Sequence, residues 1–413
     1  MRKAFPALLA GAAALASVPL LMAGTALAQT QVRVVVSHYS DQTQGLFEGM
    51  AADFEAANPD IDIVIEDVAW AVLQQRLTTD IAGGTAPDVS IIGTRWLVDF
   101  AANDIVEPLD DYVDEEFRSR FIDTFMAPST IDGVLYGLPV AASARAMYYN
   151  KDLLEQAGVD GPPKTWDELK VAAEKVSALG DDIYGFAIQG GGDTEVEAYY
   201  FYSLWTHGGE IMDGDKSGLG SQAAIDAAQT YKDLIDAGVT QPGVTSYNRE
   251  DIESMLKQGK VGMILSGPWL RGQLKEESPD LNYGIAPIPA GSTQATYGVT
   301  DSIVIFASSE VKDEAFKFLH DAVFTDKWRR EFTLKEGFLP VFKSVAEDPH
   351  FADDPELQAF TGMLPYAKFA PLLENWQEIA DVAKASLQRI YTGEAEPETA
   401  MKDAAAKIDG ILN

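Results

Sequence analysis

The sequence contains no cysteine. This absence excludes disulfide bonds, thiolate metal sites, cysteine nucleophiles and lipid attachment to an amino-terminal cysteine. Basic residues are also scarce, because 31 lysines and arginines stand against 64 aspartates and glutamates and leave a net charge of −33. A surface of this charge repels nucleic acid and anionic lipid and favours solubility over association. We therefore predict a monomer with no nucleic-acid partner.

Long apolar runs are missing beyond the amino terminus. There, Arg2 and Lys3 precede an apolar run at residues 7–23, and Ala-Leu-Ala follows at 26–28. This is the layout of a secretory signal peptide, so we expect residues 1–28 to be removed. The alternative is a membrane anchor, but the run is short for a span of about 20 residues. The mature chain is expected in the periplasm, without a lipid anchor.

The length of the chain predicts two domains. Removing 28 of the 413 residues leaves 385, which exceeds what one hydrophobic core usually serves. The sequence has no internal repeat, no low-complexity tract and no long linker rich in proline or serine. Two lobes without a flexible tether suggest that the chain crosses between them more than once.

The hydrophobic pattern alternates between strand and helix periods, which predicts an α/β fold with parallel pairing. In the first part of the chain, strands are expected at 32–37, 61–68 and 88–92, with helices at 44–57 and 70–82. Later strands are expected at 184–188, 261–265, 281–286 and 302–306, and helices at 195–207, 222–237, 379–391 and 399–412. Ligands of such sheets bind beyond the carboxyl ends of the strands, which indicates residues 38–41 and 93–96.

Seven sequence segments, taken together and in order, carry a family resemblance over essentially the whole mature chain. They are FEAANPDIDI at 54–63, GGTAPDV at 83–89, GLPVAASARAMYYNKDLLEQAGVDGPPKTWDEL at 137–169, LWTHGGEI at 204–211, KQGKVGMILSGPW at 257–269, YGIAPIPAG at 283–291 and EGFLPV at 336–341. The sequence resembles the extracellular solute-binding proteins that serve carbohydrate ABC importers, the family that includes the maltose-binding protein.

The resemblance implies a type II periplasmic binding protein fold, in which each of two lobes is a mainly parallel sheet flanked by helices. Lobe 1 is then expected at 29–140 plus 300–341, and lobe 2 at 141–299 plus 342–413. The crossings between them are expected near 139–144, near 289–300 and just after Pro340. A sugar would bind in the cleft between the lobes, hinge closure would enclose it, and the permease of an ABC transporter would receive it. No cofactor and no metal are implied.

Trp269 is the first candidate for sugar stacking, because a flat aromatic face suits the CH groups of a sugar ring. It follows the end of a predicted strand and the turn Gly267-Pro268, which would aim the ring outward. The alternative is an indole packed beneath the turn, since tryptophan is usually largely buried. Gly267 would permit close approach of the backbone to the ligand.

His38, Tyr39, Ser40 and Asp41 follow the first predicted strand, at its carboxyl edge. Several family members carry an aromatic pair near this position, where this chain has His-Tyr. His38 is equally interpretable as a structural residue, and Asp41 as the cap of the helix that begins near Thr43.

Thr94 and Arg95 occupy the corresponding edge after the third predicted strand, whereas the neighbouring Trp96 fits an apolar helix face. Arg95 and Arg145 are arginines at the predicted cleft in a chain with few basic residues, so each is a candidate for pairing with an anionic ligand. For Arg145, an ion pair with one of the abundant carboxylates is the alternative.

The remaining ligand-binding candidates lie in a glycine-rich turn, at the second and third crossings and, for Trp376, near a carboxyl-terminal helix. The turn leads into a predicted helix, whose N–H groups could meet a hydroxyl or an anion, although a simple capped turn is the alternative. Trp376 has helical spacing and fits the core equally well. These candidates are Gly191, Gly192, Asp193, Tyr297, Gly298, Thr300, Asp301, Gly337, Phe338 and Trp376.

An enzyme is not predicted. The sequence has no G-x-S-x-G elbow, no H-E-x-x-H pair and no Walker motif, and its four histidines lack the spacing of metal ligands. A pair of glycosidase carboxylates carries no signal among 64 acidic residues. A sensory binding module is a third class that the sequence does not separate from transport. The ligand class also stays open between neutral sugars or polyols and phosphorylated or sulfonated derivatives.

Overall fold

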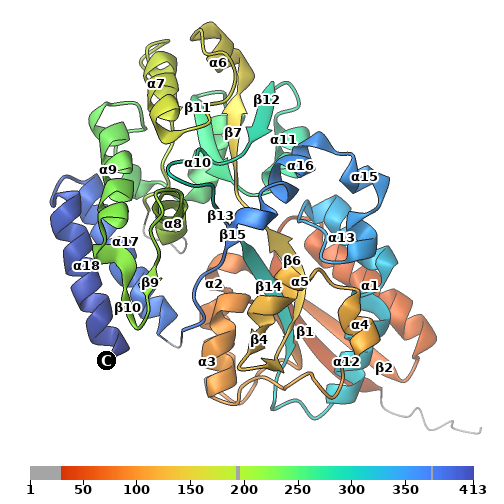
Figure 1. Cartoon of the computed structure of the whole chain (residues 1–413). Coiled ribbons are helices and arrows are strands. Elements are labelled where there is room, and N and C mark those ends of the chain that lie inside the picture. The colour runs from red at the N-terminus through yellow and green to blue at the C-terminus, as the bar shows by residue number, and fades with distance from the viewer. Residues whose placement is uncertain (1–28, 192–195, 374) are drawn as a thin grey trace, which may run out of the picture.

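The computed structural model describes residues 29–191, 196–373 and 375–413. Figure 1 shows two bodies, each built on a β-sheet with helices around it. The fold is mixed α/β, as the sequence predicted. The predicted Gly192 and Asp193 lie outside the described residues. Within the described part of the chain, no helix is both long and apolar enough to cross a membrane.

The first sheet has the strand order β2-β1-β3-β14-β6. Its strands are β2 (Ile61–Ala69), β1 (Thr30–His38), β3 (Val89–Gly93), β14 (Val299–Ile305) and β6 (Leu138–Ser143). Strand β1 pairs in parallel with both β2 and β3, whereas β14 is antiparallel to both β3 and β6. Strand β14 therefore runs opposite to its four companions, and the sheet is mainly parallel.

Both faces of the first sheet are covered by helices, which is why β1 is apolar in its middle rather than alternating. Val34 and Val36 join the core cluster of Phe47 on α1, whereas Val35 joins the cluster of Leu73 on α2. The helices on this side are α1 (Thr43–Ala57), α2 (Trp70–Ala82), α3 (Leu97–Ala102), α4 (Glu115–Ser119), α5 (Asp123–Met126), α12 (Lys312–Phe318) and α13 (Asp326–Glu336).

The second sheet has the order β12-β7-β11-β8. Its strands are β12 (Tyr283–Ala286), β7 (Ala146–Asn150), β11 (Val261–Ser266) and β8 (Tyr184–Phe186). Only β7 runs opposite to the others within this sheet. The helices of this body are α6 (Lys151–Gln156), α7 (Trp166–Ser177), α8 (Val196–Thr206), α9 (Gln222–Asp236), α10 (Arg249–Lys257), α11 (Leu270–Glu277), α17 (Trp376–Tyr391) and α18 (Pro397–Leu412).

The chain passes between the sheets at three places. Strand β6 leads within two residues into β7, and β13 (Thr296–Tyr297) leads directly into β14. On the third passage, α16 (Pro355–Thr361) contacts β12, and β15 (Ala367–Lys368) pairs with β13.

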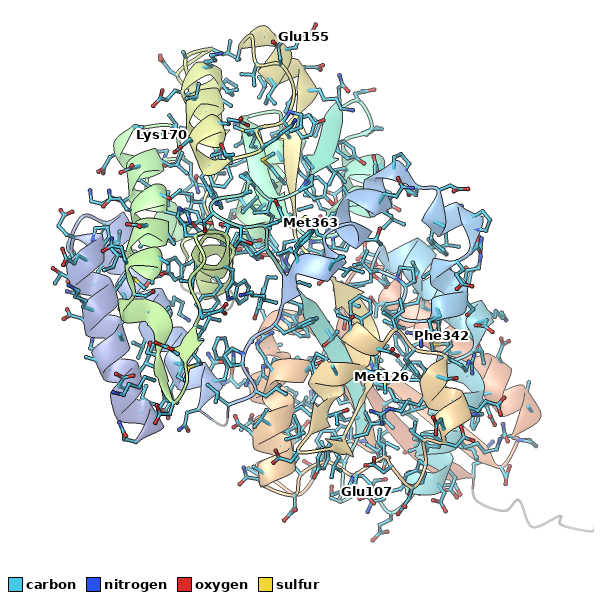
Figure 2. All side chains as sticks on the ribbon, viewed as in Figure 1. Glu107, Met126, Glu155, Lys170, Phe342 and Met363 are labelled. Carbon is cyan, nitrogen blue, oxygen red and sulfur yellow. The ribbon has the colours of Figure 1, made fainter. Side chains whose placement is uncertain are left out.

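The third passage begins beyond Pro340. Phe342 forms a β-bridge with Phe121, and in Figure 2 it lies within the body of the first sheet, whereas Met363 lies between the two bodies. The short helices α14 (Lys343–Ala346) and α15 (Pro349–Ala352) then follow, and α14 packs on α13. We therefore propose that the first lobe extends through α15, and we keep the other predicted boundaries as proposals.

Candidate functional site

A cavity of about 330 Å³ lies between the two sheets. We call it the main cavity. The parallel strands β1 and β2 both end at it, as ligand sites of such sheets require. From the side of the first sheet it is lined by His38, Tyr39, Ala69, Trp70, Ala71, Val299, Asp301 and Phe338. From the side of the second sheet it is lined by Arg145, Arg249, Glu250, Glu253, Trp269 and Gln273, and Ser143 lies at the first passage.

Trp269 lines the main cavity and is held in place by its neighbours. Its indole Nε1 donates to Oε1 of Glu253 over 3.0 Å, and the same oxygen accepts from the Ser266 hydroxyl over 2.5 Å. A Cβ on Gly267 would come within 2.1 Å of the indole, so only glycine fits there. Gly267 therefore makes room for Trp269, and close approach of its backbone to the ligand stays a prediction.

Two guanidinium groups lie against the indole. The Cζ atoms of Arg145 and Arg249 are 4.7 and 5.1 Å from the ring centroid of Trp269. Arg145 is buried, and its Nη1 donates to the Ser143 hydroxyl over 2.6 Å. Cation–π contacts of this kind contribute about 0.5–2 kcal/mol each, more when water is excluded. The indole is therefore fixed in orientation before any ligand arrives.

Glu253 is a carboxyl group buried beneath this cluster. Burial raises the pKa of Glu253, while the charge of Arg249 and the hydrogen bonds from Ser266 and Trp269 act in the opposite direction. Arg249 Nε lies 4.0 Å from Oε1 of Glu253, and its Nη2 lies 2.6 Å from Oε1 of Glu250. The positive charge of Arg249 thus has two carboxylates beside it.

On the side of the first sheet, Tyr39 donates its hydroxyl to Oδ2 of Asp301 over 2.8 Å. Burial raises the pKa of Tyr39 well above its usual value, with Asp301 acting in the same direction, so the phenol stays protonated as a donor. The ring of Tyr39 packs edge to face on the ring of Phe338, with the ring centroids 4.7 Å apart. His38 Nδ1 lies 2.7 Å from Oδ2 of Asp67, a contact that orients the imidazole at the cavity rim.

The loop that carries His38 and Tyr39 is anchored by Thr43. The Thr43 hydroxyl accepts the N–H groups of Tyr39 and Ser40 over 3.0 and 3.1 Å and donates to Oε1 of Glu336 over 2.7 Å. Burial raises the pKa of Glu336, and the hydrogen bond from Thr43 opposes this.

Two other candidates in this loop do not enter the cavity. The Ser40 hydroxyl accepts the N–H of Gln42, and Asp41 is fully exposed. The capping interpretation of Asp41 was wrong, because the N-cap of α1 is Gln42 and makes no side-chain cap hydrogen bond.

Five predicted residues gather at a second, smaller cavity of about 30 Å³. They are Thr94, Arg95, Tyr297, Gly298 and Thr300. The Thr94 hydroxyl is 2.7 Å from that of Ser302 and accepts from that of Thr300 over 3.0 Å, so it is occupied within the sheet. Arg95 lies over the rings of Trp70 and Trp96 at 5.8 and 5.5 Å, outside the lining of the main cavity.

Three predicted residues have structural surroundings instead. The N–H of Gly191 donates to the carbonyl of Tyr247 over 2.9 Å. Gly337 has φ 76° at the end of α13, and a Cβ there would lie 3.3 Å from the backbone of Trp269. The prediction that Trp376 reaches the cleft is corrected, because its side chain is 3% exposed and packs on Phe201 with ring centroids 5.9 Å apart.

Sequence reasoning missed Trp70, Arg249 and Glu253 as lining residues. Trp70 had a signal, because it directly follows a predicted strand at the carboxyl edge. Arg249 and Glu253 had none, because an arginine and a glutamate four residues apart are typical of any exposed helix. Among the described residues, no three histidine, aspartate or glutamate side chains are placed to hold a metal ion.

The comparisons with known proteins point to one family. The family model described as bacterial extracellular solute-binding protein matches residues 40–328. A Brucella abortus protein, provisionally named as a binding protein, is 52% identical over 401 residues, which are 96% of this chain and 97% of that one.

Two further relatives carry a ligand in their names. The maltotriose-binding protein of Pyrococcus abyssi is 27% identical over 82% of this chain and 73% of its own length. A solved ABC transporter solute-binding protein of Thermotoga lettingae, bound with α-D-tagatose, superposes with a TM-score of 0.86 at 25% identity, over 93% of this chain and 100% of that one. From the family match, the 52% identity and the shared fold, we conclude that this chain is a member of the bacterial extracellular solute-binding protein family.

Proposed function

We propose that this chain is the periplasmic substrate-binding protein of an ABC importer, and that it captures a neutral sugar or sugar derivative in the main cavity. The observation that carries the proposal is the pre-oriented indole of Trp269, which faces a cavity whose polar groups come from both sheets. Relatives named for maltotriose, and solved with α-D-tagatose, support a carbohydrate ligand. The partner would be the permease of the importer.

The lining of the main cavity suits sugar chemistry. Aromatic faces bind the CH side of a pyranose ring, while Asp301, Glu253 and the guanidinium groups offer acceptors and donors for hydroxyls. Buried polar groups of this kind discriminate strongly between ligands, because a ligand that lacks the matching hydroxyl leaves them unpaired.

A neutral ligand is favoured over an anionic one by the charges around the cavity. Arg249 is beside Glu250 and Glu253, and Asp301 adds a further negative charge. Of the two arginines predicted as partners of an anionic group, Arg95 lies over Trp70 and Trp96 outside the main cavity, whereas Arg145 lines the main cavity.

The two lobes would close on the ligand because it contacts both sides of the main cavity. The ligand would touch Tyr39 and Asp301 from one sheet and Trp269 from the other, so it would bind the closed form better than the open form. Such differential affinity is what a hinge motion between lobes requires.

Thermal unfolding of residues 29–413 tests the proposal. The panel is glucose, maltose, lactose, trehalose, maltotriose, glycerol, glycerol 3-phosphate and glucose 6-phosphate. A sugar at 1,000 times its Kd adds about 4 kcal/mol to the free energy of unfolding and raises the melting temperature. Trp269→Ala should abolish the shift, whereas Trp328→Ala, a matched change outside the main cavity, should keep it.

The alternatives give different outcomes in the same experiment. Shifts with the phosphorylated compounds alone would replace the neutral ligand by an anionic one. No shift with any compound would refute the carbohydrate assignment. Chromatography of the sugar after incubation should recover it unchanged, and cleavage products would indicate an enzyme instead.

A further inference from the structure

The segment at residues 336–339 belongs to the body of the first sheet and lies against the body of the second. It begins at the end of α13, and it contacts the turn that leads from β11 into α11 (Figure 1). At its start, Glu336 accepts the hydroxyl of Thr43. At its end, the N–H of Leu339 donates to the carbonyl of Ala142 on β6 over 2.9 Å. Both ends of the segment are therefore tied to the first body.

Gly337 lies against the backbone of the turn in the second body. A Cβ on Gly337 would lie 3.3 Å from both the carbonyl oxygen of Pro268 and the Cα of Trp269. The distance to the Cα is shorter than the optimum of about 3.5–4.0 Å between non-bonded carbon atoms. The φ of 76° at Gly337 also favours glycine. Glycine at this position thus lets the two bodies approach each other, although it lines neither the main cavity nor the second one.

The turn at residues 267–269 is held within its own body. The hydroxyl of Tyr148 donates to the carbonyl of Gly267 over 2.8 Å, and the N–H of Arg271 donates to the carbonyl of Pro268 over 3.2 Å. The turn cannot shift away alone without losing these hydrogen bonds. A side chain at position 337 would therefore move one body relative to the other.

Phe338 fills the space between the aromatic side chains of the two bodies. Its ring centroid lies 4.7 Å from that of Tyr39 and 6.0 Å from that of Trp269. On α13, Phe332 stacks on Phe338 with centroids 5.9 Å apart at 19°. Both phenylalanines are buried, so close packing fixes the ring of Phe338. The separation between Tyr39 and Trp269 is therefore set through Phe338.

We infer that Gly337 and Phe338 are positioning residues that set the width of the main cavity between Tyr39 and Trp269. Gly337 determines how near the two bodies come, and Phe338 spaces the two rings. A ligand contacts both sides at once only at this width, so its affinity depends on Gly337, a residue outside the lining of the cavity. The inference rests on the proposed function for the nature of the ligand, whereas the spacing of the bodies is a property of the protein alone.

Substitutions of Gly337 test this inference. Gly337→Ala adds the Cβ, and Gly337→Asn adds a larger side chain of a residue type that tolerates positive φ. Gly393 is the matched control, because it is exposed just after α17, has φ 73°, and a Cβ there would meet no atom within 4 Å. Gly393→Ala and Gly393→Asn therefore introduce a similar backbone strain without a contact between the bodies.

Calorimetry measures the Kd for maltose or lactose, whichever raises the melting temperature of the wild type more. Overpacking the contact at position 337 should raise the Kd by about fivefold in Gly337→Ala and by about 30-fold in Gly337→Asn. Both Gly393 variants should bind the sugar as the wild type does. The melting temperature without sugar shows whether each variant is folded.

The spacing of the bodies is measured with two spin labels, which the absence of natural cysteines makes specific. Val72→Cys places one label on α2 beside the lining residue Ala71, and Glu276→Cys places the other on α11, one turn beyond the lining residue Gln273. Both positions are exposed, and they lie on opposite sides of the main cavity. Gly337→Asn should lengthen the distance between the labels with and without sugar, whereas Gly393→Asn should leave it unchanged.

The possible failures are distinguishable. The inference is refuted if folded Gly337→Asn keeps the wild-type Kd, or if its Kd rises while the distance between the labels stays the same. An equal rise of the Kd in Gly393→Asn also refutes it, because backbone strain alone then accounts for the loss. If Gly337→Asn does not fold, the same criteria apply to Gly337→Ala. If the wild type binds no sugar, the proposed function is refuted, and the distance without sugar still tests the inference.

Discussion

Replacing Thr43 by valine should weaken both the fold and ligand binding, because one hydroxyl makes three hydrogen bonds. It accepts the N–H groups of Tyr39 and Ser40 and donates to the buried Glu336. Each unsatisfied polar group costs about 1–3 kcal/mol. The two N–H groups are only partly buried and can recruit water, so we take about 1 kcal/mol for each and up to about 2 kcal/mol for the carboxyl. Thr43→Val should therefore lower the free energy of unfolding by about 2–4 kcal/mol.

Urea denaturation measures this loss, and calorimetry with the best-binding sugar measures its effect on the site. Because Tyr39 lines the main cavity, a looser loop should also raise the Kd. Thr43→Ser keeps the hydroxyl and should recover most of the stability and most of the affinity. If Thr43→Val unfolds within 0.5 kcal/mol of the wild type, about the ordinary effect of a surface substitution, then the hydroxyl does not anchor the loop and our reasoning is wrong.

Three further predictions concern the indole, the buried carboxyl and the core. Trp269→Phe keeps an aromatic face but loses the hydrogen bond to Glu253. It should raise the Kd for the sugar by about fivefold, which is equivalent to about 1 kcal/mol. An unchanged Kd by calorimetry would exclude a role for that hydrogen bond. Because burial raises the pKa of Glu253, the free energy of unfolding of the wild type should fall relative to that of Glu253→Gln as the pH rises above about 4.5. If urea denaturation gives parallel curves of unfolding free energy against pH for the two proteins, this prediction is wrong. Trp376→Ala should lower the free energy of unfolding by about 3–5 kcal/mol, and a normal melting temperature with lost sugar binding would return Trp376 to the cleft.

The fold was largely predictable because its signals are local or span one strand-helix-strand unit. The expected strand at 61–68 corresponds to β2, and the helical face of Leu46, Phe47, Met50 and Phe54 is buried as its spacing required. Strand β14 begins three residues before the predicted position, so it includes Asp301. The start of the third passage stays a prediction. The bridge between Phe342 and Phe121, on which our proposed boundary rests, is a long-range contact that leaves no periodic pattern in the sequence.

The candidate site was only partly predictable. Position at a strand end identified Tyr39 and Trp269, and the same rule would have identified Trp70. The same rule also selected Arg95, but Arg95 lies over the ring of Trp70 and lines the second, smaller cavity. Which side of a strand end faces the cavity depends on packing between elements that are distant in sequence. The positions of Arg249 and Glu253 depend on how α10 lies against the second sheet, and no sequence pattern reports this.

The place of β14 in the first sheet has a consequence for biosynthesis. This strand separates β3 from β6, although it follows β6 by about 150 residues in the chain. Ribosomes add about 5–20 residues per second, so the sheet stays without its fourth strand for roughly 8–30 s after β6 has been made. The first sheet therefore stays incomplete until β14 has been made. A chain whose first sheet is completed this late stays incompletely folded for longer, which suits passage through a narrow export channel.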